Sequence, residues 1–88
     1  MFILSNNGKK IINFDNVASV YMKNEFMRHS NSPTWWEIRV MYPAVGSDIL
    51  YDKLGEFETE EECKDTFDKL CSRIANGKEK EVINMKDL

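Results

Sequence analysis

The segment from Leu54 to Gly77 most constrains the fold of this chain, because it holds the end of a strand, a complete helix start and a helix stop. Thr59 and Glu62 have the spacing of a capping box, in which each side chain accepts a hydrogen bond from the other residue's backbone N–H. The acidic residues after Thr59 suit the positive end of the helix dipole. Asn76 and Gly77 are typical of a helix end. The sequence therefore predicts one helix between Thr59 and Asn76.

The predicted helix is amphipathic, with one apolar stripe formed by Cys63, Phe67, Leu70, Cys71 and Ile74. Its two cysteines are eight residues apart, or about 12 Å along the helix axis. The Cα atoms of a disulfide are at most roughly 7 Å apart, so these cysteines cannot bridge each other. They also lack the close spacing of a zinc site. We expect two buried thiols that act as small apolar groups, and no metal.

Five segments before the helix have strand character: residues 1–4, 9–14, 18–23, 34–42 and 48–57. The Asn7-Gly8 pair between the first two is a strong hairpin signal. Short turns between the segments favour an antiparallel meander of about five strands. One C-terminal amphipathic helix can cover only one face of that sheet, so the expected fold class is α+β with two layers. For the fifth strand, burial of Ile49 and Tyr51 or of Leu50 and Leu54 both fit the sequence.

The chain has 88 residues, which corresponds to one domain. We expect that domain to span residues 1–77 and to be followed by a tail, 78–88. The tail could form a short sixth strand, an arm packed on a neighbouring molecule, or a partly disordered end. A domain of this size buries a modest core. Self-association would add buried area, so we expect a homo-oligomer.

The formal net charge of −3 argues against partners that need a concentrated basic surface. We therefore expect neither binding to a nucleic acid polymer nor binding to a membrane. The apolar run at residues 1–5 is too short for a signal peptide, and no run approaches the length that spans a bilayer. These features predict a cytoplasmic protein.

The candidate site lies on the sheet face that the helix leaves uncovered. In the strand 34–42, alternate residues point to opposite faces, and the helix is expected to lie on the face of Val20, Trp36, Ile38 and Val40. The other face then carries Tyr21, Trp35, Arg39 and Met41, with Arg28 from the segment 24–33 as a further candidate. Exposed aromatic, methionine and arginine side chains are typical of ligand and partner sites.

These side chains are compatible with more than one use. An arginine can pair with phosphate while an aromatic ring stacks on a base, which would suit a nucleotide-like ligand. The same face could instead form a subunit or protein interface. Trp35 could also be covered by the segment 24–33, and cross-strand aromatic pairs can stabilise a sheet without binding anything.

Nothing in the sequence marks a catalytic centre. His29 is the only histidine and follows Arg28 in a polar segment. There is no nucleophile elbow, acid–base pair, phosphate-binding glycine loop or calcium-loop pattern. We expect a non-enzymatic protein without a cofactor; a small hydrolase would require His29 to meet a nucleophile across a subunit boundary.

Two blocks, residues 2–4 with 11–17 and residues 54–63, together resemble a broad group of small uncharacterised proteins from Firmicutes and their phages. The first block ends in Ile-Asn-Phe-Asp-Asn-Val; the second reads Leu-Gly-Glu-Phe-Glu-Thr-Glu-Glu-Glu-Cys. This chain differs from the group in a longer segment 24–33, the Trp35-Trp36 pair, and Cys63 where alanine is common. The resemblance carries over no activity and no site residue. It implies a mobile-element setting, in which small proteins often counter host defence.

Two hypotheses follow for the function. The first is an oligomeric binding protein, a phage counter-defence factor that sequesters a nucleotide-like anionic ligand with Arg28, Arg39, Tyr21 and Trp35. The alternative is a protein-interaction module that inhibits or scaffolds a host protein through the same aromatic sheet face.

Overall fold

The computed structural model describes residues 1–26, 33–78 and 80–88. This part of the chain forms six strands, one α-helix and two short 3₁₀ helices. In chain order they are β1 (Phe2–Leu4), β2 (Ile11–Asn13), η1 (Phe14–Asn16), β3 (Ser19–Phe26), β4 (Pro33–Met41), β5 (Tyr51–Phe57), α1 (Glu60–Ala75), β6 (Val82–Asn84) and η2 (Met85–Asp87). The α+β class expected from the sequence is confirmed.

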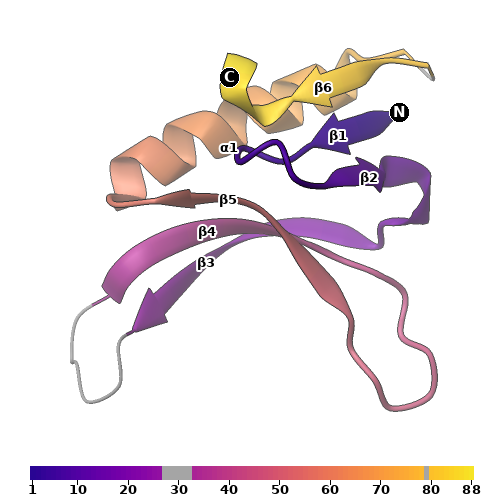
Figure 1. Ribbon diagram of the computed structural model, residues 1–88, viewed down its shortest axis with the longest axis horizontal. Helices are drawn as coiled ribbons and strands as arrows, with labels where there is room; N and C mark the ends of the chain where they lie inside the picture. Colours follow the sequence, from indigo (N-terminus) through magenta and orange to yellow (C-terminus); the bar gives the residue numbers. More distant parts are fainter. Residues whose placement is uncertain (27–32, 79) are drawn as a thin grey trace.

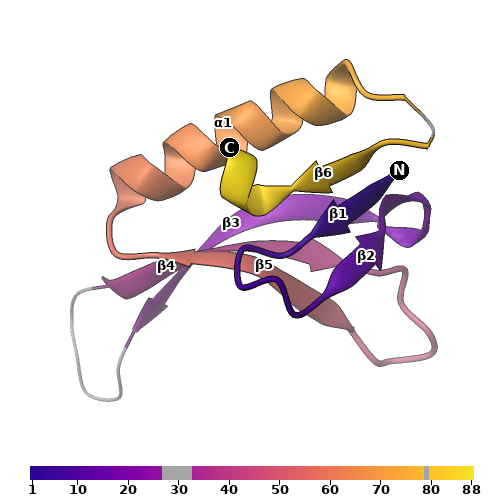
Figure 2. The same cartoon turned by 45° about the horizontal axis from the view of Figure 1, so that its top comes forward.

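The strands form two three-stranded sheets rather than one meander of about five strands. Sheet A has the order β2-β1-β6, and sheet B has the order β3-β4-β5 (Figures 1 and 2). β2 pairs antiparallel with one side of β1, and β6 pairs parallel with its other side. The third strand of sheet A is thus β6 from the C-terminal end of the chain, whereas β3 begins sheet B.

α1 begins as the capping residues predicted. The Oγ1 of Thr59 accepts a hydrogen bond from the backbone N–H of Glu62 at 3.2 Å. Cys63 and Leu70 are the fully buried residues of the helix, with Phe67 and Ile74 packed around the same core. The apolar stripe therefore faces inward, as expected.

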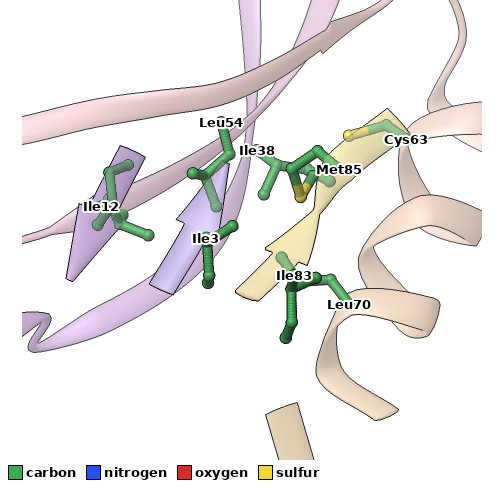
Figure 3. Packing of buried hydrophobic residues seen from close by; sticks show 9 residues of the cluster. Ile3, Ile12, Ile38, Leu54, Cys63, Leu70, Ile83 and Met85 are labelled. Atoms are coloured by element: carbon green, nitrogen blue, oxygen red, sulfur yellow. The ribbon is translucent and has the colours of Figure 1, made fainter. Parts of the chain in front are cut away.

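The core lies between sheet B on one side and α1 together with sheet A on the other (Figure 1). Ile38, Val40 and Leu54 come from sheet B and are completely buried. Sheet A contributes Ile3, Ile12 and Ile83. In Figure 3, Ile83 lies next to Leu70 of the helix, and Ile12 lies at the opposite end of the cluster. The inner face of sheet B is thus the face predicted to receive the helix, but the helix shares it with the second sheet.

The C-terminal segment is part of this core. Ile83 of β6 lies opposite Ile3 of β1 and is completely buried, and Met85 in η2 is 3% exposed. Of the three forms considered for the tail, the structure shows a short strand that pairs within its own subunit. Residues 78–88 therefore belong structurally with residues 1–77.

The two strands that flank β1 end in the same local structure. In β2–η1, the Oδ1 of Asn13 accepts from the backbone N–H of Asp15 at 3.1 Å; in β6–η2, Asn84 accepts from Lys86 at 3.0 Å. Such an asparagine turns the backbone because its side chain accepts a hydrogen bond from the backbone N–H two residues later, in place of a hydrogen bond between strands. The repeated Ile-Asn pair ends each strand after three residues.

A bulge in β5 decides which of its residues face the core. The register against β4 shifts so that Ile38 lies opposite Gly55 and Arg39 lies opposite Lys53. Leu54 is therefore the extra residue of the bulge, and it is completely buried. Leu50 and Ile49 remain exposed before the strand begins, and Tyr51 is 52% exposed.

Replacing Ile83 with alanine tests whether the C-terminal strand stabilises the whole domain. Ile83→Ala leaves a cavity between β1 and α1, so we expect the free energy of unfolding to fall by about 2–5 kcal/mol. Val82→Ala is the matched control, because Val82 precedes Ile83 on the opposite face and is 54% exposed; its effect should stay within about 0.5 kcal/mol. Urea denaturation followed by circular dichroism measures both, and equal effects would contradict the assigned packing.

Candidate functional site

The open face of sheet B is the face turned away from α1 and sheet A, both of which lie on the same side of sheet B in Figure 1. Register and alternation place eleven side chains on it. They are Ser19, Tyr21, Lys23 and Glu25 of β3, Trp35, Glu37, Arg39 and Met41 of β4, and Tyr51, Lys53 and Glu56 of β5.

Glu37 is at the centre of this face. It is only 5% exposed although no helix or sheet covers it, because neighbouring side chains surround its carboxylate. Trp35 Nε1 donates to its Oε2 at 2.6 Å, and Arg39 Nε donates to its Oε1 at 2.7 Å. Lys53 Nζ lies 3.9 Å from Oε2. Each carboxylate oxygen of Glu37 therefore accepts a hydrogen bond from an N–H group, and a positive charge lies near each.

Arg39 links all three strands of the open face. Its Nη2 donates to the Oε1 of Glu25 on β3 at 2.5 Å, while its Nε contacts Glu37 on its own strand. Its guanidinium carbon lies 4.4 Å from the centre of the Tyr51 ring on β5, within the range of a cation–π contact. The Arg39 side chain is 12% exposed. Its charge is thus already paired with two carboxylates and stacked on one ring.

Charges on the open face balance in sign. Lys53 also pairs with Glu56, so the cations Lys23, Arg39 and Lys53 accompany three carboxylates. Around them lie Tyr21, Trp35, Met41 and Tyr51, which supply aromatic and thioether surface. The face combines apolar area with charges of both signs. Its tyrosine, tryptophan, methionine and arginine side chains are types enriched in protein interfaces, although lysine and glutamate are depleted there. Its charges do not form the concentrated basic surface that polyanions need.

The ion pairs shift the pKa values of their members. Burial alone would raise the pKa of Glu37, but hydrogen bonds from Trp35 and Arg39 and the charges of Arg39 and Lys53 outweigh it and lower that pKa below 4.5. Burial would likewise lower the pKa of Arg39, whereas its bonds to Glu37 and Tyr21 and the charge of Glu25 raise it. Both shifts favour the ionised forms of Glu37 and Arg39.

Glu37 and Arg39 are poorly suited to acid–base chemistry or to anion binding. Glu37 is held in its charged form, so it has no proton to give, and its oxygens accept hydrogen bonds from Trp35 and Arg39. A phosphate at Arg39 would lie beside the carboxylates of Glu25 and Glu37, which would repel it.

Four of the five candidate residues from the sequence come together on the open face: Tyr21, Trp35, Arg39 and Met41. Arg28 and His29 lie outside the described residues. Sequence reasoning placed Glu37 on this face but gave it no role. The available signal was its position two residues from both Trp35 and Arg39, which puts all three on one face of one strand. Glu25 and Tyr51 depend on register, which the sequence does not reveal.

Two hollows in the described part of the chain are not lined by Tyr21, Trp35, Arg39 or Met41. One of about 250 Å³ lies at the β5 bulge beside the β1–β2 turn and is lined by Asn6, Asn7 and residues 53–56. It is smaller than the 300–1,000 Å³ typical of ligand pockets. A wider one of about 490 Å³ follows the helix and is lined by Asn76, Lys78, Lys80 and Glu81. Neither contains an aromatic side chain on which a base could stack.

Cys63 is completely buried in the core, whereas Cys71 is only partly buried, so the expectation of two buried thiols holds for Cys63 alone. Burial, with a smaller contribution from Glu60, raises the pKa of Cys63 to about 11, and burial with Asp68 raises the pKa of Cys71. Thiols with raised pKa values are poor nucleophiles at neutral pH. Within the ranges that the structure describes, no three histidine, cysteine or acidic side chains are grouped to hold a metal ion. No described helix is long and apolar enough to cross a membrane.

Comparison of the chain with protein-family models, with curated proteins and with solved structures finds no match in any of the three.

Glu37→Gln tests whether the carboxylate holds the open face together. The amide keeps the shape but loses the charge that Arg39 and Lys53 compensate, so the free energy of unfolding should fall by about 1.5–3 kcal/mol, as for hydrogen bonds to a charged group. Glu56→Gln removes a carboxylate whose side chain is 54% exposed and should cost at most about 1 kcal/mol. Urea titrations at neutral pH compare the two variants, and a larger loss for Glu56→Gln would contradict the central role of Glu37.

The stabilisation from Glu37 should depend on pH in a defined direction. Because the pKa of Glu37 is lower in the folded state, the unfolded chain binds more protons as the pH falls below 4.5. The advantage of the wild type over Glu37→Gln is therefore complete above the unfolded pKa and shrinks as the pH falls through the folded pKa. Urea midpoints of both proteins between neutral pH and pH 3 measure this difference. A difference that is constant over that range would be inconsistent with an ionised Glu37.

Proposed function

We propose that this protein is a non-enzymatic interaction module that binds a partner protein through the open face of sheet B. The proposal rests on one observation: the open face carries both apolar or aromatic side chains and a network of ion pairs. The four apolar or aromatic side chains are Tyr21, Trp35, Met41 and Tyr51. Tyr, Trp, Met and Arg are enriched where proteins bind one another. Because Arg39 and Trp35 are already held by Glu37, they are preorganised and lose little conformational freedom on binding.

The pairing of Arg39 is also the reason for preferring a protein partner to a nucleotide-like anion. An anion at this face would meet the carboxylates of Glu25 and Glu37 next to the guanidinium. Both carboxylates would repel it, and displacement of either would leave a buried or half-buried carboxylate without its partner. A protein surface can instead cover the intact network and use Tyr51 and Met41 for apolar contact.

The mobile-element setting implied by the sequence resemblance suggests the class of partner. A small phage protein that blocks a host factor needs a rigid surface and no catalytic group. The open face meets both requirements, since its side chains are fixed by each other on a three-stranded sheet. The proposed mechanism is therefore inhibition or scaffolding of a host protein.

Substitution of Tyr51 tests the proposal. Affinity capture from host extract identifies a stoichiometric partner, and calorimetry with that purified partner then measures the dissociation constant. Tyr51→Ala removes exposed aromatic surface on the open face without removing a hydrogen bond of Glu37. We expect it to weaken binding at least tenfold, corresponding to about 1.4 kcal/mol.

Val82→Ala is the control for this experiment, because Val82 is similarly exposed but belongs to sheet A. It should leave the dissociation constant unchanged. Equal affinities of wild type and Tyr51→Ala would refute the proposed surface. Binding of a nucleotide in a calorimetric panel, lost in Arg39→Ala, would favour the sequestration hypothesis instead.

A further inference from the structure

Strand β3 has an edge that is ready to pair. It lies at the margin of sheet B, and in the described ranges no other strand pairs with its outer side. Its eight residues, Ser19–Phe26, contain no proline. The only irregularity against β4 is the shift between Glu25 and Phe26, where the extra residue belongs to β4. β3 therefore keeps regular alternation along its length and lacks the proline and bulge that usually protect edge strands.

We propose that β3 pairs antiparallel with β3 of a second copy of this chain, about a two-fold axis at Asn24. Met22–Phe26 of each copy would then pair, and the two sheets B would join into one six-stranded sheet. This dimer goes beyond the partner-binding function proposed above and does not depend on it, since it uses the strand edge and not the open face.

Charge complementarity favours this register. With Asn24 opposite Asn24 of the partner subunit, Lys23 lies opposite the partner's Glu25, and the same pair recurs across the axis. Opposite charges in directly opposed positions stabilise antiparallel strands. The Oε1 of Glu25 accepts a hydrogen bond from Arg39. The second carboxylate oxygen of Glu25 can therefore accept a hydrogen bond from a lysine.

Apolar side chains match in the same register. Met22 and Phe26 share the face of β3 that α1 covers, because alternation is uninterrupted along this strand. Phe26 is 47% exposed in the single subunit, whereas Met22 packs against the core. Pairing about Asn24 places Phe26 opposite the partner's Met22, so an exposed ring becomes part of a continuous apolar surface.

Neighbouring registers that keep the two faces aligned are less complementary. An axis at Lys23 would oppose two like charges directly. An axis at Met22 would keep one apolar pair, Met22 opposite the partner's Met22. It would place Val20 opposite Asn24 and Glu25 opposite Ser19, so the charge pairing is lost. The axis at Asn24 alone matches apolar with apolar, cation with anion and amide with amide. This self-complementarity identifies a second copy as the occupant of the edge.

In the dimer the open faces of the two subunits become continuous, because the strands of both sheets B then share one plane. The Glu37 clusters would repeat on either side of the axis. A partner that is itself a dimer, or that carries two equivalent sites, could then engage both faces at once.

A charge-swap experiment tests the pairing. Size-exclusion chromatography with light scattering should give twice the 10.3 kDa of one chain for the wild type. Lys23→Glu and Glu25→Lys should each be monomeric, because each homodimer would oppose like charges. An equimolar mixture of the two variants should restore the doubled mass, since every pair is then complementary again. Lys64→Glu, on the exposed side of α1, is the charge-matched control and should remain dimeric.

Cross-linking provides a second measurement that does not require removal of Glu25 from Arg39. In a Cys71→Ser background, Asn24→Cys places two thiols on directly opposed positions, where Cα atoms are about 4.5–5.5 Å apart and a disulfide can form. Oxidation should convert it to a covalent dimer. Ser19→Cys on the same strand should not link, since its two copies would lie roughly 30 Å apart along the strands.

A wild type that stays at the mass of one chain over a dilution series would overturn the proposal. So would a dimer whose mass is unchanged in Lys23→Glu, or an Asn24→Cys variant that links no better than Ser19→Cys. Circular dichroism of each variant separates loss of pairing from loss of folding. If Glu25→Lys does not fold, Lys23→Glu and the cross-linking pair still decide the matter.

Discussion

Burial of the inner face of sheet B is the constraint on which the rest of this structure depends. Ile38, Val40 and Leu54 need a cover larger than a single helix of sixteen residues provides. Sheet A supplies the remainder, and it exists only because the C-terminal segment returns to pair with β1. The two ends of the chain are therefore joined in one small sheet, whose inward side chains complete the core (Figure 3). A domain of 88 residues has little area to spare, so each of these layers is required.

The same constraint explains the unusual chemistry of the open face. Since α1 and sheet A occupy one side of sheet B, the other side must satisfy its polar groups without help from another layer. It does so with Glu37, a carboxylate surrounded by the indole N–H and the guanidinium of its own strand and by an ammonium group from β5. Desolvation of that carboxylate is offset by these partners, and the aromatic rings gain fixed positions. A face built in this way keeps a carboxylate largely buried without leaving it unpaired.

The sequence was sufficient for features determined locally and insufficient for those determined by pairing over long distances. Thr59 and Glu62 define the helix start through contacts three residues apart, and alternation in β4 separates Val40 from Arg39 correctly. No local pattern reveals that β1 pairs with β6, because a three-residue strand at each end of the chain has too little periodicity. The number of sheets was therefore wrong although the fold class was right. Likewise Trp35 and Arg39 were assigned to one face, but the partners that neutralise Arg39 come from register with β3 and β5.

Register also changes the function that these residues support. Considered alone, an arginine between a tryptophan and a tyrosine suggests phosphate binding with a base stacked beside it. Once Glu25 and Glu37 are placed against that arginine, its charge is already paired with two carboxylates. An arginine on a sheet is therefore a weaker indication of an anion site when carboxylates lie within its reach. In this protein two carboxylates do, which is the reason for proposing a protein partner instead of a free anion.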